Sequence, residues 1–484
     1  MQPVLTPDEM GAADARTIAA GTPVEVLMER AGHAVAWAVR TRLRGLYGRR
    51  AVVVCGKGNN GGDGVIAARV LRQWGARVDE FHLADGVPRA GFARALARAD
   101  VVVDAMYGTG FRGELEGDAR TVADALRDFD GAVISVDIPS GVQGLTGEAR
   151  DAAVRADETV CFAAYKPGLL FEPGRSLAGR VHVVDLGIAV SDLARAWVTE
   201  AADVASWLVP RSPDSHKWRT GCFVVGGSGG MTGAPSLVSH AAMRAGAGIV
   251  WCGVPGADAA ARLSGTEVIA KALAATPDGS LSDGAAKDVL DHLDRFRALA
   301  IGPGLGRSPT TAAAVRRIVA GARLPAVVDA DGIHAVGDDP ALLRIRSDAT
   351  ILTPHEGEYA ALRGGPPGPD RLAAARALAA DSGAIVLLKG PGTVVAAPDG
   401  RACICPTGGP WLATAGTGDV LTGVITGLLA RGLEPFEAAA AGAFVHGLAA
   451  DAAGHTGLMA GDLVSAIPRV LVDLTHDATP DAAR

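Results

Sequence analysis

Short apolar runs alternate with amphipathic stretches from the start of the chain. Residues 24–43 repeat apolar positions with helical periodicity, and residues 51–55 form an apolar, β-branched run that ends in glycines, which is typical of a buried strand leading into a turn. Upstream, Thr6, Pro7 and Glu9 form a capping-box pattern with proline at the first helical position. The opening of the chain is therefore predicted to fold as helix, helix and strand.

The alternation continues to about residue 185 and predicts a parallel, doubly wound, Rossmann-like sheet with helices on both faces. The remaining elements are expected as helices at residues 64–74 and 119–129 and as strands at residues 76–83, 101–105, 132–138, 159–163 and 181–185.

A second series of the same kind follows a break in the pattern. Residues 189–220 lose strand character and gather prolines and charged residues, which predicts a domain boundary. Further strands are expected at residues 222–225, 249–252, 298–301, 326–329, 350–352 and 385–389, and long Gly/Ala-rich helices at residues 419–431 and 435–453. The chain is thus predicted to contain two α/β domains.

Composition agrees with this division and excludes several classes of protein. The 484 residues are 49% hydrophobic, enough to fill two cores. The net charge of −7 without a block of Lys or Arg argues against a nucleic-acid partner. Because the start MQPVLTPDEM does not resemble a signal peptide and no long apolar run follows, we expect no membrane segment and a cytoplasmic location. The six scattered cysteines are expected to be reduced core residues.

The first candidate site is the segment GKGNNGGDG, which follows a predicted strand. Gly56, Gly58 and Gly61 satisfy the GxGxxG pattern of dinucleotide-binding proteins. Asp63, expected in the first helical turn, would however compete with a pyrophosphate for the helix dipole. The pattern therefore favours something other than an ordinary pyrophosphate cradle.

Polar side chains also end the neighbouring strands. Asn59 and Asn60 follow one predicted strand, Asp104 ends a second, and Asp137 ends a third, with Ser140 just beyond it. Because the carboxyl ends of parallel strands meet at one edge of the sheet, we expect these groups to surround one crevice.

The motifs NNGGDG, DAMYGTGFRGE and VDIPSG, in this order, resemble the NAD(P)HX epimerase (YjeF N-terminal) family over residues 1–209. The resemblance implies that Asn60, Asp104 and Ser140 hold a potassium ion and that Asp137 binds substrate and acts as the acid/base. Oxygen ligands suit such a hard cation. The further substrate-binding residues implied are Asn59, Asn60, Gly61, Gly62, Asp63, Gly108, Thr109, Gly110, Phe111, Arg112, Gly113 and Glu114. The helix segment LMERAGHAVA departs from the family's Asn-Ala-Gly form at Arg30.

The second candidate site is the segment TAGTGDVLTG. The chain has no GxxxxGK[ST] loop, but Gly416, Thr417 and Gly418 place backbone N–H groups at the start of a predicted helix, where they could bind an anion. Asp419 follows, where it could take a proton from a hydroxyl directed at a phosphate. The alternative is a simple Asp-capped helix after a glycine turn.

Five further glycine-rich or charged segments follow predicted strands: GGSGGMTGAP, GPGLG, VVDADG, TPHEGE and LKGPGT. Together with TAGTGD they resemble the ribokinase-like NAD(P)HX dehydratase family over residues 215–473. The resemblance implies that Ala234, Gly304, His355 and Asp419 contact hydrated NAD(P)H and that Asp419 is the catalytic base. The adenine nucleotide, accompanied by Mg²⁺, would be bound by Lys389, Gly390, Pro391, Gly392, Thr393 and Gly418.

The two resemblances together imply a metabolite-repair enzyme, expected as a homo-oligomer, whose first domain epimerises hydrated NAD(P)H. The second domain is expected to dehydrate the S epimer at the expense of ADP or ATP. Both nucleotides fit the same loops, and ADP is expected because bacterial members of the family generally use it. The alternatives are a vitamin or sugar kinase, an NAD-dependent dehydrogenase that uses the GxGxxG loop, and a non-enzymatic scaffold of the kind found in RNA-processing proteins.

Overall fold

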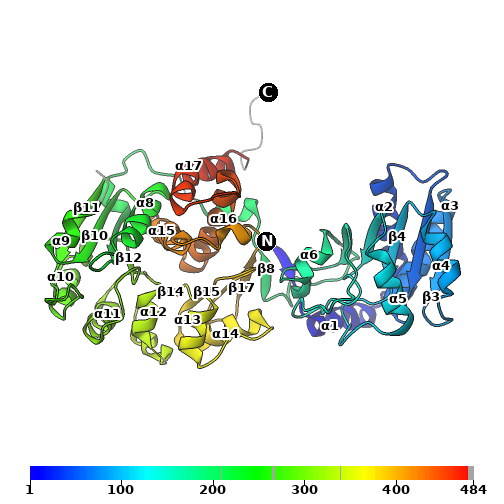
Figure 1. The fold of residues 1–484 in the computed structure, drawn as a ribbon, viewed down its shortest axis with the longest axis horizontal. Coiled ribbons are helices and arrows are strands. Elements are labelled where there is room, and N and C mark those ends of the chain that lie inside the picture. The colour runs from blue at the N-terminus through cyan, green and yellow to red at the C-terminus, as the bar shows by residue number, and fades with distance from the viewer. Residues whose placement is uncertain (209, 264–266, 338, 478–484) are drawn as a thin grey trace. The chain divides into compact units, whose positions relative to one another are not determined.

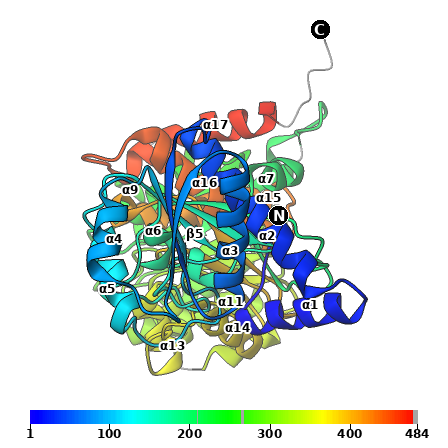
Figure 2. The same cartoon turned by 90° about the vertical axis from the view of Figure 1, so that its right-hand side faces the viewer.

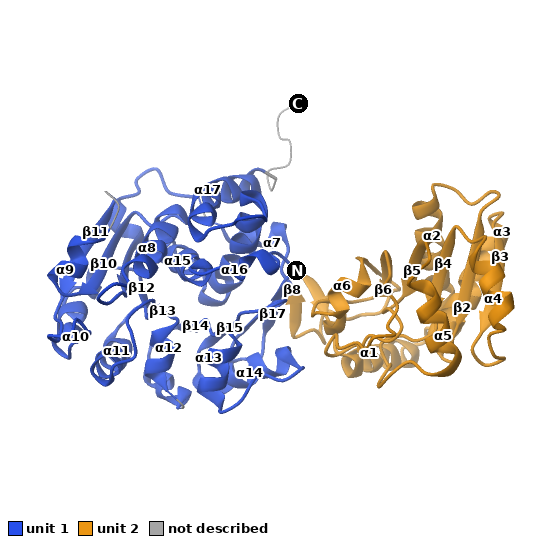
Figure 3. Cartoon of the chain, viewed as in Figure 1, with its two compact units in different colours: residues 1, 198–484 blue, residues 2–197 orange. Residues whose placement is uncertain are grey.

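The computed structural model describes residues 1–208, 210–263, 267–337 and 339–477, and the chain divides into two compact units (Figures 1 and 3). The N-terminal unit comprises residues 2–197, and the C-terminal unit comprises Met1 and the chain from Val198 onward. The division falls inside strand β8 (Ala196–Val198). The predicted end of the first domain, Val209, lies outside the described residues.

The N-terminal unit contains a parallel sheet with the strand order β3-β2-β4-β5-β6-β7. Its strands are β2 (Arg50–Cys55), β3 (Arg77–His82), β4 (Val101–Ala105), β5 (Ala132–Val136), β6 (Glu158–Phe162) and β7 (Arg180–Val184). Its helices are α1 (Pro7–Ala19), α2 (Val24–Leu43), α3 (Asn59–Gln73), α4 (Arg89–Leu96), α5 (Gly117–Leu126) and α6 (Gly174–Ala178), and a short strand β1 (Gln2–Val4) precedes α1. The predicted doubly wound sheet is confirmed, as is the capping box at Thr6 and Glu9.

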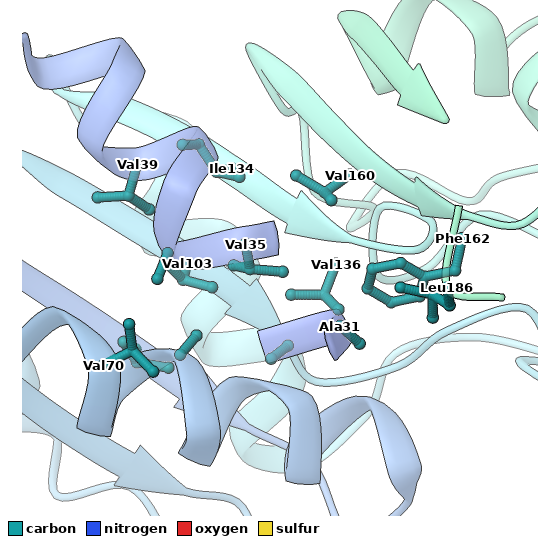
Figure 4. Close-up of a cluster of buried hydrophobic side chains, with 14 of the residues drawn as sticks. Ala31, Val35, Val39, Val70, Val103, Ile134, Val136, Val160, Phe162 and Leu186 are labelled. Atoms are coloured by element: carbon teal, nitrogen blue, oxygen red, sulfur yellow. The ribbon is translucent and has the colours of Figure 1, made fainter. Parts of the chain in front are cut away.

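Helices cover both faces of this sheet, with α2 and α3 on one face and α4 and α5 on the other (Figure 2). Alternate residues of each strand face opposite ways, so Val53 packs with α2 and α3 while Val52 and Val54 pack with α4 and α5. Figure 4 shows the first cluster, where Val35 of α2 lies among the valines and isoleucine of the strands. Each such buried side chain stabilises the fold by about 1.5–3 kcal/mol.

Helix α3 begins at Asn59, so the predicted start at residue 64 is wrong. The glycines lower helix propensity, but they are needed for packing: a Cβ at Gly61 would lie 2.0 Å from the carbonyl oxygen of Gly56. Asp63 therefore lies in the second helical turn, not the first, and is only 7% exposed.

The C-terminal unit contains a larger sheet with the order β17-β16-β15-β14-β13-β12-β9-β10-β11, parallel except for the β15-β16-β17 meander. Its strands are β9 (Gly221–Val225), β10 (Ile249–Pro255), β11 (Val268–Leu273), β12 (Ala298–Ile301), β13 (Ala326–Val328), β14 (Thr350–Leu352), β15 (Ile385–Leu388), β16 (Thr393–Ala396) and β17 (Ala402–Cys405).

Two layers of helices enclose this sheet (Figure 1). One layer holds α8 (Gly233–Arg244), α15 (Thr417–Ala430), α16 (Pro435–Ala453) and α17 (Ala460–Asp477), and the other holds α10 (Gly284–Leu290), α11 (Pro309–Gly321), α12 (Asp331–Val336), α13 (Glu356–Arg363) and α14 (Arg371–Ser382). Helices α7 (Ala201–Trp207) and α9 (Ala257–Ala261) complete the unit. Helices α15 and α16 are buried along almost their whole length, as their apolar composition predicted.

Two smaller sequence predictions also have an outcome. All six cysteines are free and buried, as expected. Within the described ranges, no helix combines the length and apolar character needed to cross a membrane.

Candidate active sites

A cavity of about 670 Å³ opens at the carboxyl edge of the N-terminal sheet. It is bounded by α1, α2, the start of α3 and the loops that follow β4 and β5. Of the predicted substrate-binding residues, those that line it are Asn59, Asn60, Asp63, Gly108, Thr109, Gly110, Phe111 and Asp137. The crevice predicted from the strand ends is thus present, and its volume is in the range typical of small-molecule sites.

The remaining predicted residues of this site lie beside the cavity rather than on its wall. Gly61 and Gly62 belong to the first turn of α3 and pack inward. Arg112 donates hydrogen bonds to the carbonyls of Thr109 and Phe111, and Glu114 lies 3.5 Å from Arg150. Arg112, Gly113 and Glu114 therefore shape the loop that carries Gly108–Phe111.

Asp137 occupies a strained position in the cavity wall. Its φ is 65°, in the left-handed region that non-glycine residues rarely adopt. Its Oδ2 accepts a hydrogen bond from Thr109 N at 3.1 Å, and its Oδ1 accepts one from Lys166 Nζ at 2.6 Å. A Cβ at Gly108 would lie 3.3 Å from Asp137 Oδ2, so the glycine keeps space open beside the carboxylate.

Lys166, which sequence reasoning missed, is 1% exposed. Burial lowers the pKa of its ammonium group, but the charge of Asp137 outweighs that effect, and the net direction is upward. The available indication was a lysine within the apolar segment CFAAYKPGLLF, since lysine is almost never buried without a partner.

Two of the other carboxyl groups that line the cavity with Asp137 have a raised pKa. Burial raises the pKa of Asp63 to about 8, and the charges of Asp137 and Asp14 add to the rise. The pKa of Asp14 on α1 is also raised, first by burial. The cavity therefore holds more acidic groups than it can keep ionised together.

Asp104, Ser140 and Asn60, the residues predicted to hold potassium, lie next to this cavity. Asp104 is 1% exposed and accepts hydrogen bonds from Ser140 Oγ at 2.6 Å, Ser140 N at 2.9 Å and Ser135 Oγ at 2.9 Å. Burial raises the pKa of Asp104, and within the described part of the chain no cationic side chain pairs with it. Asn60 lines the cavity wall, and its buried Nδ2 has no hydrogen-bond partner there.

A second buried ion pair forms the centre of the site in the C-terminal unit. Lys389 Nζ lies 2.9 Å from Asp329 Oδ1 and 3.6 Å from Glu358 Oε2, while Thr422 Oγ1 of α15 donates to Asp329 Oδ2 at 2.7 Å. Burial alone would raise the pKa of Asp329, but Lys389 and Thr422 outweigh it and the net direction is downward. Asp329, Glu358 and Thr422 were not singled out from the sequence, although all three lie within quoted motifs.

The glycine turn before α15 lies beside this pair. A Cβ at Gly418 would be 3.6 Å from Lys389 Nζ, so the helix N-terminus and the ammonium group face the same space. Burial raises the pKa of Asp419 to about 7, with Asp329 as the next cause. His446 Nε2 hydrogen-bonds the carbonyl of Thr417 at 2.9 Å, and burial lowers the pKa of His446 to about 4, so a neutral imidazole holds the turn.

The predicted substrate contacts of this unit come from two places on the sheet edge. Gly304 has φ 71°, and a Cβ there would lie 3.3 Å from the Cβ of Ala234, so the structure brings these two residues together. His355 caps α13: its Nδ1 accepts from Gly357 N and Glu358 N. Its side chain is 59% exposed and lies 3.5 Å from Glu358 Oε1, which connects it to Lys389 through Glu358.

The predicted nucleotide loop, Lys389–Thr393, joins β15 to β16. Its lysine turns inward to Asp329, while Gly390, at φ 144°, lies against Arg371. Arg371 is 8% exposed and donates to the carbonyl of Lys389 at 2.9 Å. Gly390 and Pro391 are exposed, whereas Gly392, in the left-handed region (φ 72°), is buried, so the first part of the turn is open to a ligand.

Comparisons with known proteins agree with this architecture. A family profile described as NAD(P)H-hydrate dehydratase matches residues 222–469, and one described as YjeF-related protein N-terminus matches residues 24–94 and 87–168. The bifunctional NAD(P)H-hydrate repair enzyme of Moorella thermoacetica is 40% identical over 94% of this chain and 94% of its own. The enzyme of the same name from Escherichia coli is 33% identical over 96% of this chain and 93% of its own.

Solved structures resemble the C-terminal unit. The ADP/ATP-dependent NAD(P)H-hydrate dehydratase from Bacillus subtilis, co-crystallised with ATP/Mg²⁺, is 30% identical with a TM-score of 0.51 and covers 57% of this chain and 98% of its own. A ribokinase-like superfamily protein from Enterococcus faecalis is 21% identical with a TM-score of 0.50, covers 58% of this chain and 96% of its own, and shows the shared fold.

The folds and sites define a two-unit α/β enzyme, with a Rossmann-like sheet in one unit and a ribokinase-like sheet in the other. The chain belongs to the family of bifunctional NAD(P)H-hydrate repair enzymes. The predicted family, both fold classes and the pairing of an isomerase with a lyase activity are confirmed. The similarity along nearly the whole chain supports neither a sugar kinase, nor a dehydrogenase, nor a scaffold.

Proposed function

We propose that the cavity of the N-terminal unit interconverts the R and S epimers of hydrated NADH and NADPH, and that the site around Asp419 dehydrates the S epimer with an adenine nucleotide. The observation that carries this division is the pair of separate polar centres, one around Asp137 and one around Asp419. Each centre lies within a unit matched by a different family profile. The predicted homo-oligomer and cytoplasmic location stay predictions.

In the N-terminal unit, Asp137 is proposed to move the proton of the substrate hydroxyl. Its strained backbone and its bonds from Thr109 and Lys166 fix the carboxylate in the cavity wall, which suits a group that must meet one hydroxyl in a defined geometry. The loops at residues 59–63 and 108–114 would bind the rest of the substrate.

The potassium ion is proposed to be held by Asn60, Asp104 and Ser140. Two observations fit a cation: the buried carboxylate of Asp104 has no cationic side chain paired with it, and the terminal amide of Asn60 has an unpaired buried atom that would offer an oxygen if the amide were flipped. When bound, a potassium ion would offset the charge of Asp104 and fix the loops that carry the site.

In the C-terminal unit, Asp419 is proposed to accept the proton of the substrate hydroxyl as that oxygen takes a phosphoryl group from the nucleotide. The phosphate ester then leaves as inorganic phosphate while the adjacent ring carbon loses a proton, which restores the double bond. Gly418 and the Lys389–Thr393 loop would bind the nucleotide phosphates, because backbone N–H groups at a helix start and an ammonium group face one space there. Ala234, Gly304 and His355 would contact the hydrated cofactor.

Magnesium is proposed to enter with the nucleotide, as the Bacillus subtilis structure co-crystallised with ATP/Mg²⁺ supports. Nucleotide phosphates supply most ligands of such an ion, and the site offers carboxylates at Asp329, Glu358 and Asp419 beside them. ADP is the proposed phosphoryl donor, with ATP as the alternative.

The near-ultraviolet absorbance of the reduced nicotinamide would test both activities together. Purified protein is incubated with mixed epimers, Mg²⁺, K⁺ and ADP, with ATP in a parallel reaction and Asp419→Ala as the control. We expect complete recovery of NADH by the natural chain and none above background by the variant. Recovery of half the substrate would refute the epimerase role, and no recovery with either nucleotide would refute the dehydratase role.

A further inference from the structure

The ammonium group of Lys166 has all of its hydrogen-bonding capacity in use. Nζ lies 2.6 Å from Asp137 Oδ1, 2.8 Å from the carbonyl of Phe162 and 3.5 Å from Cys161 Sγ. A lysine ammonium has three donors, and each has a partner. Lys166 is therefore placed to hold a fixed positive charge next to one carboxylate, not to exchange a proton or form a bond with the substrate.

That charge is paired with one of several acids. Asp14, Asp63, Glu116, Asp118 and Asp137 all line the cavity, but the direct ion pair is with Asp137. Asp63 lies on α3, is 7% exposed, and forms no ion pair with another described residue. Two carboxylates of one cavity thus have contrasting surroundings, the arrangement that separates an acid from a base.

The titration behaviour agrees with this geometry. Burial and the neighbouring charges raise the pKa of Asp63 to about 8, so Asp63 carries a proton at neutral pH. The other titratable groups facing the cavity are Asp14 on α1 and the lining residues Lys57, Tyr107, Glu116 and Asp118, while Cys161 lies under Lys166. Burial raises the pKa of the Cys161 thiol to about 11, so this group adds no charge near Lys166.

We propose that Lys166 is a positioning residue that holds Asp137 as the proton acceptor of the epimerase, and that Asp63 is the catalytic residue that donates the second proton. The proposal rests on the proposed epimerase function of this cavity and divides its proton transfers between two residues.

The division meets the requirements of the reaction. Hydration places a hydroxyl on the ring carbon next to the ring nitrogen. As Asp137 takes the hydroxyl proton, the oxygen forms a carbonyl, the carbon–nitrogen bond breaks with its electron pair going to nitrogen, and Asp63 gives its proton to that nitrogen. Rotation about the adjacent carbon–carbon bond and reversal of the same steps forms the other epimer and returns both protons. No oxidant or other reactant is consumed.

The test follows conversion of the isolated R epimer by the full-length protein, with the dehydratase reaction converting the S product to NADH. A parallel reaction that starts from the S epimer measures the dehydratase alone. This reaction is the internal control for each variant. We expect Lys166→Met to lower epimerase kcat/KM about 100-fold at pH 7, the size of an acid–base contribution. The loss should diminish as pH rises, because the unpaired carboxylate then needs higher pH to lose its proton. Lys166→Arg should recover part of the rate.

Asp63→Asn tests the donor. In the natural chain kcat/KM should fall above about pH 8 as Asp63 loses its proton, and the asparagine variant should be slower and lack this decline. In a chain that already carries Asp137→Asn, Lys166→Met should not lower kcat/KM any further, because Lys166 acts through Asp137.

Equal losses by Lys166→Met at every pH, or losses that add to those of Asp137→Asn, would show a purely structural role and overturn the proposal. If kcat/KM of Asp63→Asn still falls above about pH 8, Asp63 is not the proton donor. If the natural chain converts the S epimer but not the R epimer, the epimerase function itself fails, and this proposal fails with it.

Discussion

The two units use the same chemical arrangement in different settings. Each has a buried lysine–aspartate pair, Lys166 with Asp137 and Lys389 with Asp329, and each has a nearby carboxyl group with a raised pKa. The lysine of the N-terminal unit is 1% exposed, whereas the side chain of Lys389 is 19% exposed and faces a helix N-terminus. In the proposed function, the first pair would serve proton transfer in the N-terminal cavity, and the second would leave room for the phosphate groups of the nucleotide.

The contrast shows how position along a helix changes the role of an acid. Asp63 lies in the second turn of α3, among other carboxylates, and its pKa is raised to about 8. Asp419 lies in the first turn of α15, where Lys389 offsets part of the effect of burial, and its pKa is raised to about 7. At neutral pH the carboxyl group of Asp63 is therefore mainly protonated, as a proton donor must be, while that of Asp419 is ionised in part, as a base must be.

The largest expected effect is that of Asp419→Asn. Removing the base should lower the dehydratase rate from the S epimer about 1000-fold, within the range of general base catalysis. In the natural chain a base with a pKa of about 7 becomes protonated as pH falls, so kcat/KM should fall tenfold per pH unit below about pH 7. The rate of NADH formation from pH 5 to 9 measures both effects.

The control for Asp419→Asn is the rate at which the two epimers interconvert, followed by chromatography. This rate should match that of the natural chain, because the N-terminal unit should be unaffected. A variant that keeps a tenth or more of the natural dehydratase rate would exclude Asp419 as the base.

Two glycine substitutions at helix starts should have opposite effects. In Gly61→Ala the added Cβ would lie 2.0 Å from the carbonyl oxygen of Gly56, and the backbone would have to move, so we expect destabilisation by about 3 kcal/mol. In Gly418→Ala the nearest atom is Lys389 Nζ at 3.6 Å, and alanine should stabilise the helix by about 0.5–1 kcal/mol. The same methyl group would obstruct a bound phosphate and raise the nucleotide KM about tenfold.

Thermal unfolding and nucleotide titration distinguish these outcomes. If Gly418→Ala binds the nucleotide as well as the natural chain does, the helix start is not the phosphate site. If Gly61→Ala is as stable as the natural chain, close packing does not explain the glycine.

The sequence predicted the sheets well because buried parallel strands and long apolar helices have strong local patterns, as at residues 298–301 and 435–453. It placed the start of α3 too late because the reason for Gly61 is a tertiary contact with Gly56, which no local pattern records. Strands β16 and β17, two four-residue strands that form an antiparallel meander with β15, were missed.

Motifs indicated where the site residues lie along the chain but not which of them pair. Asp137 and Asp419 were singled out as strand-end and helix-start carboxylates, whereas Lys166 is separated from Asp137 by 29 positions and by a whole strand. Lys389 was assigned to the nucleotide, but its ion pair with Asp329 depends on contact between residues 60 positions apart. Charge pairing across strands is set by the fold, so it could not be read from spacing.

The smallest expected effect distinguishes a bound potassium ion from hydrogen bonding alone. Ser135 and Ser140 each donate one side-chain hydrogen bond to Asp104, at 2.9 and 2.6 Å, but only Ser140 is proposed as an ion ligand. Each alanine variant should lose about 1 kcal/mol of stability.

Replacing K⁺ by choline should lower epimerase activity several-fold and lower the Tm of the N-terminal unit in the natural chain and in Ser135→Ala, because a ligand that binds the folded state stabilises it. Ser140→Ala should respond weakly to the same exchange. Equal responses in the two variants would mean that Ser140 supports Asp104 only as a hydrogen-bond donor, and that the buried charge of Asp104 is tolerated without a cation.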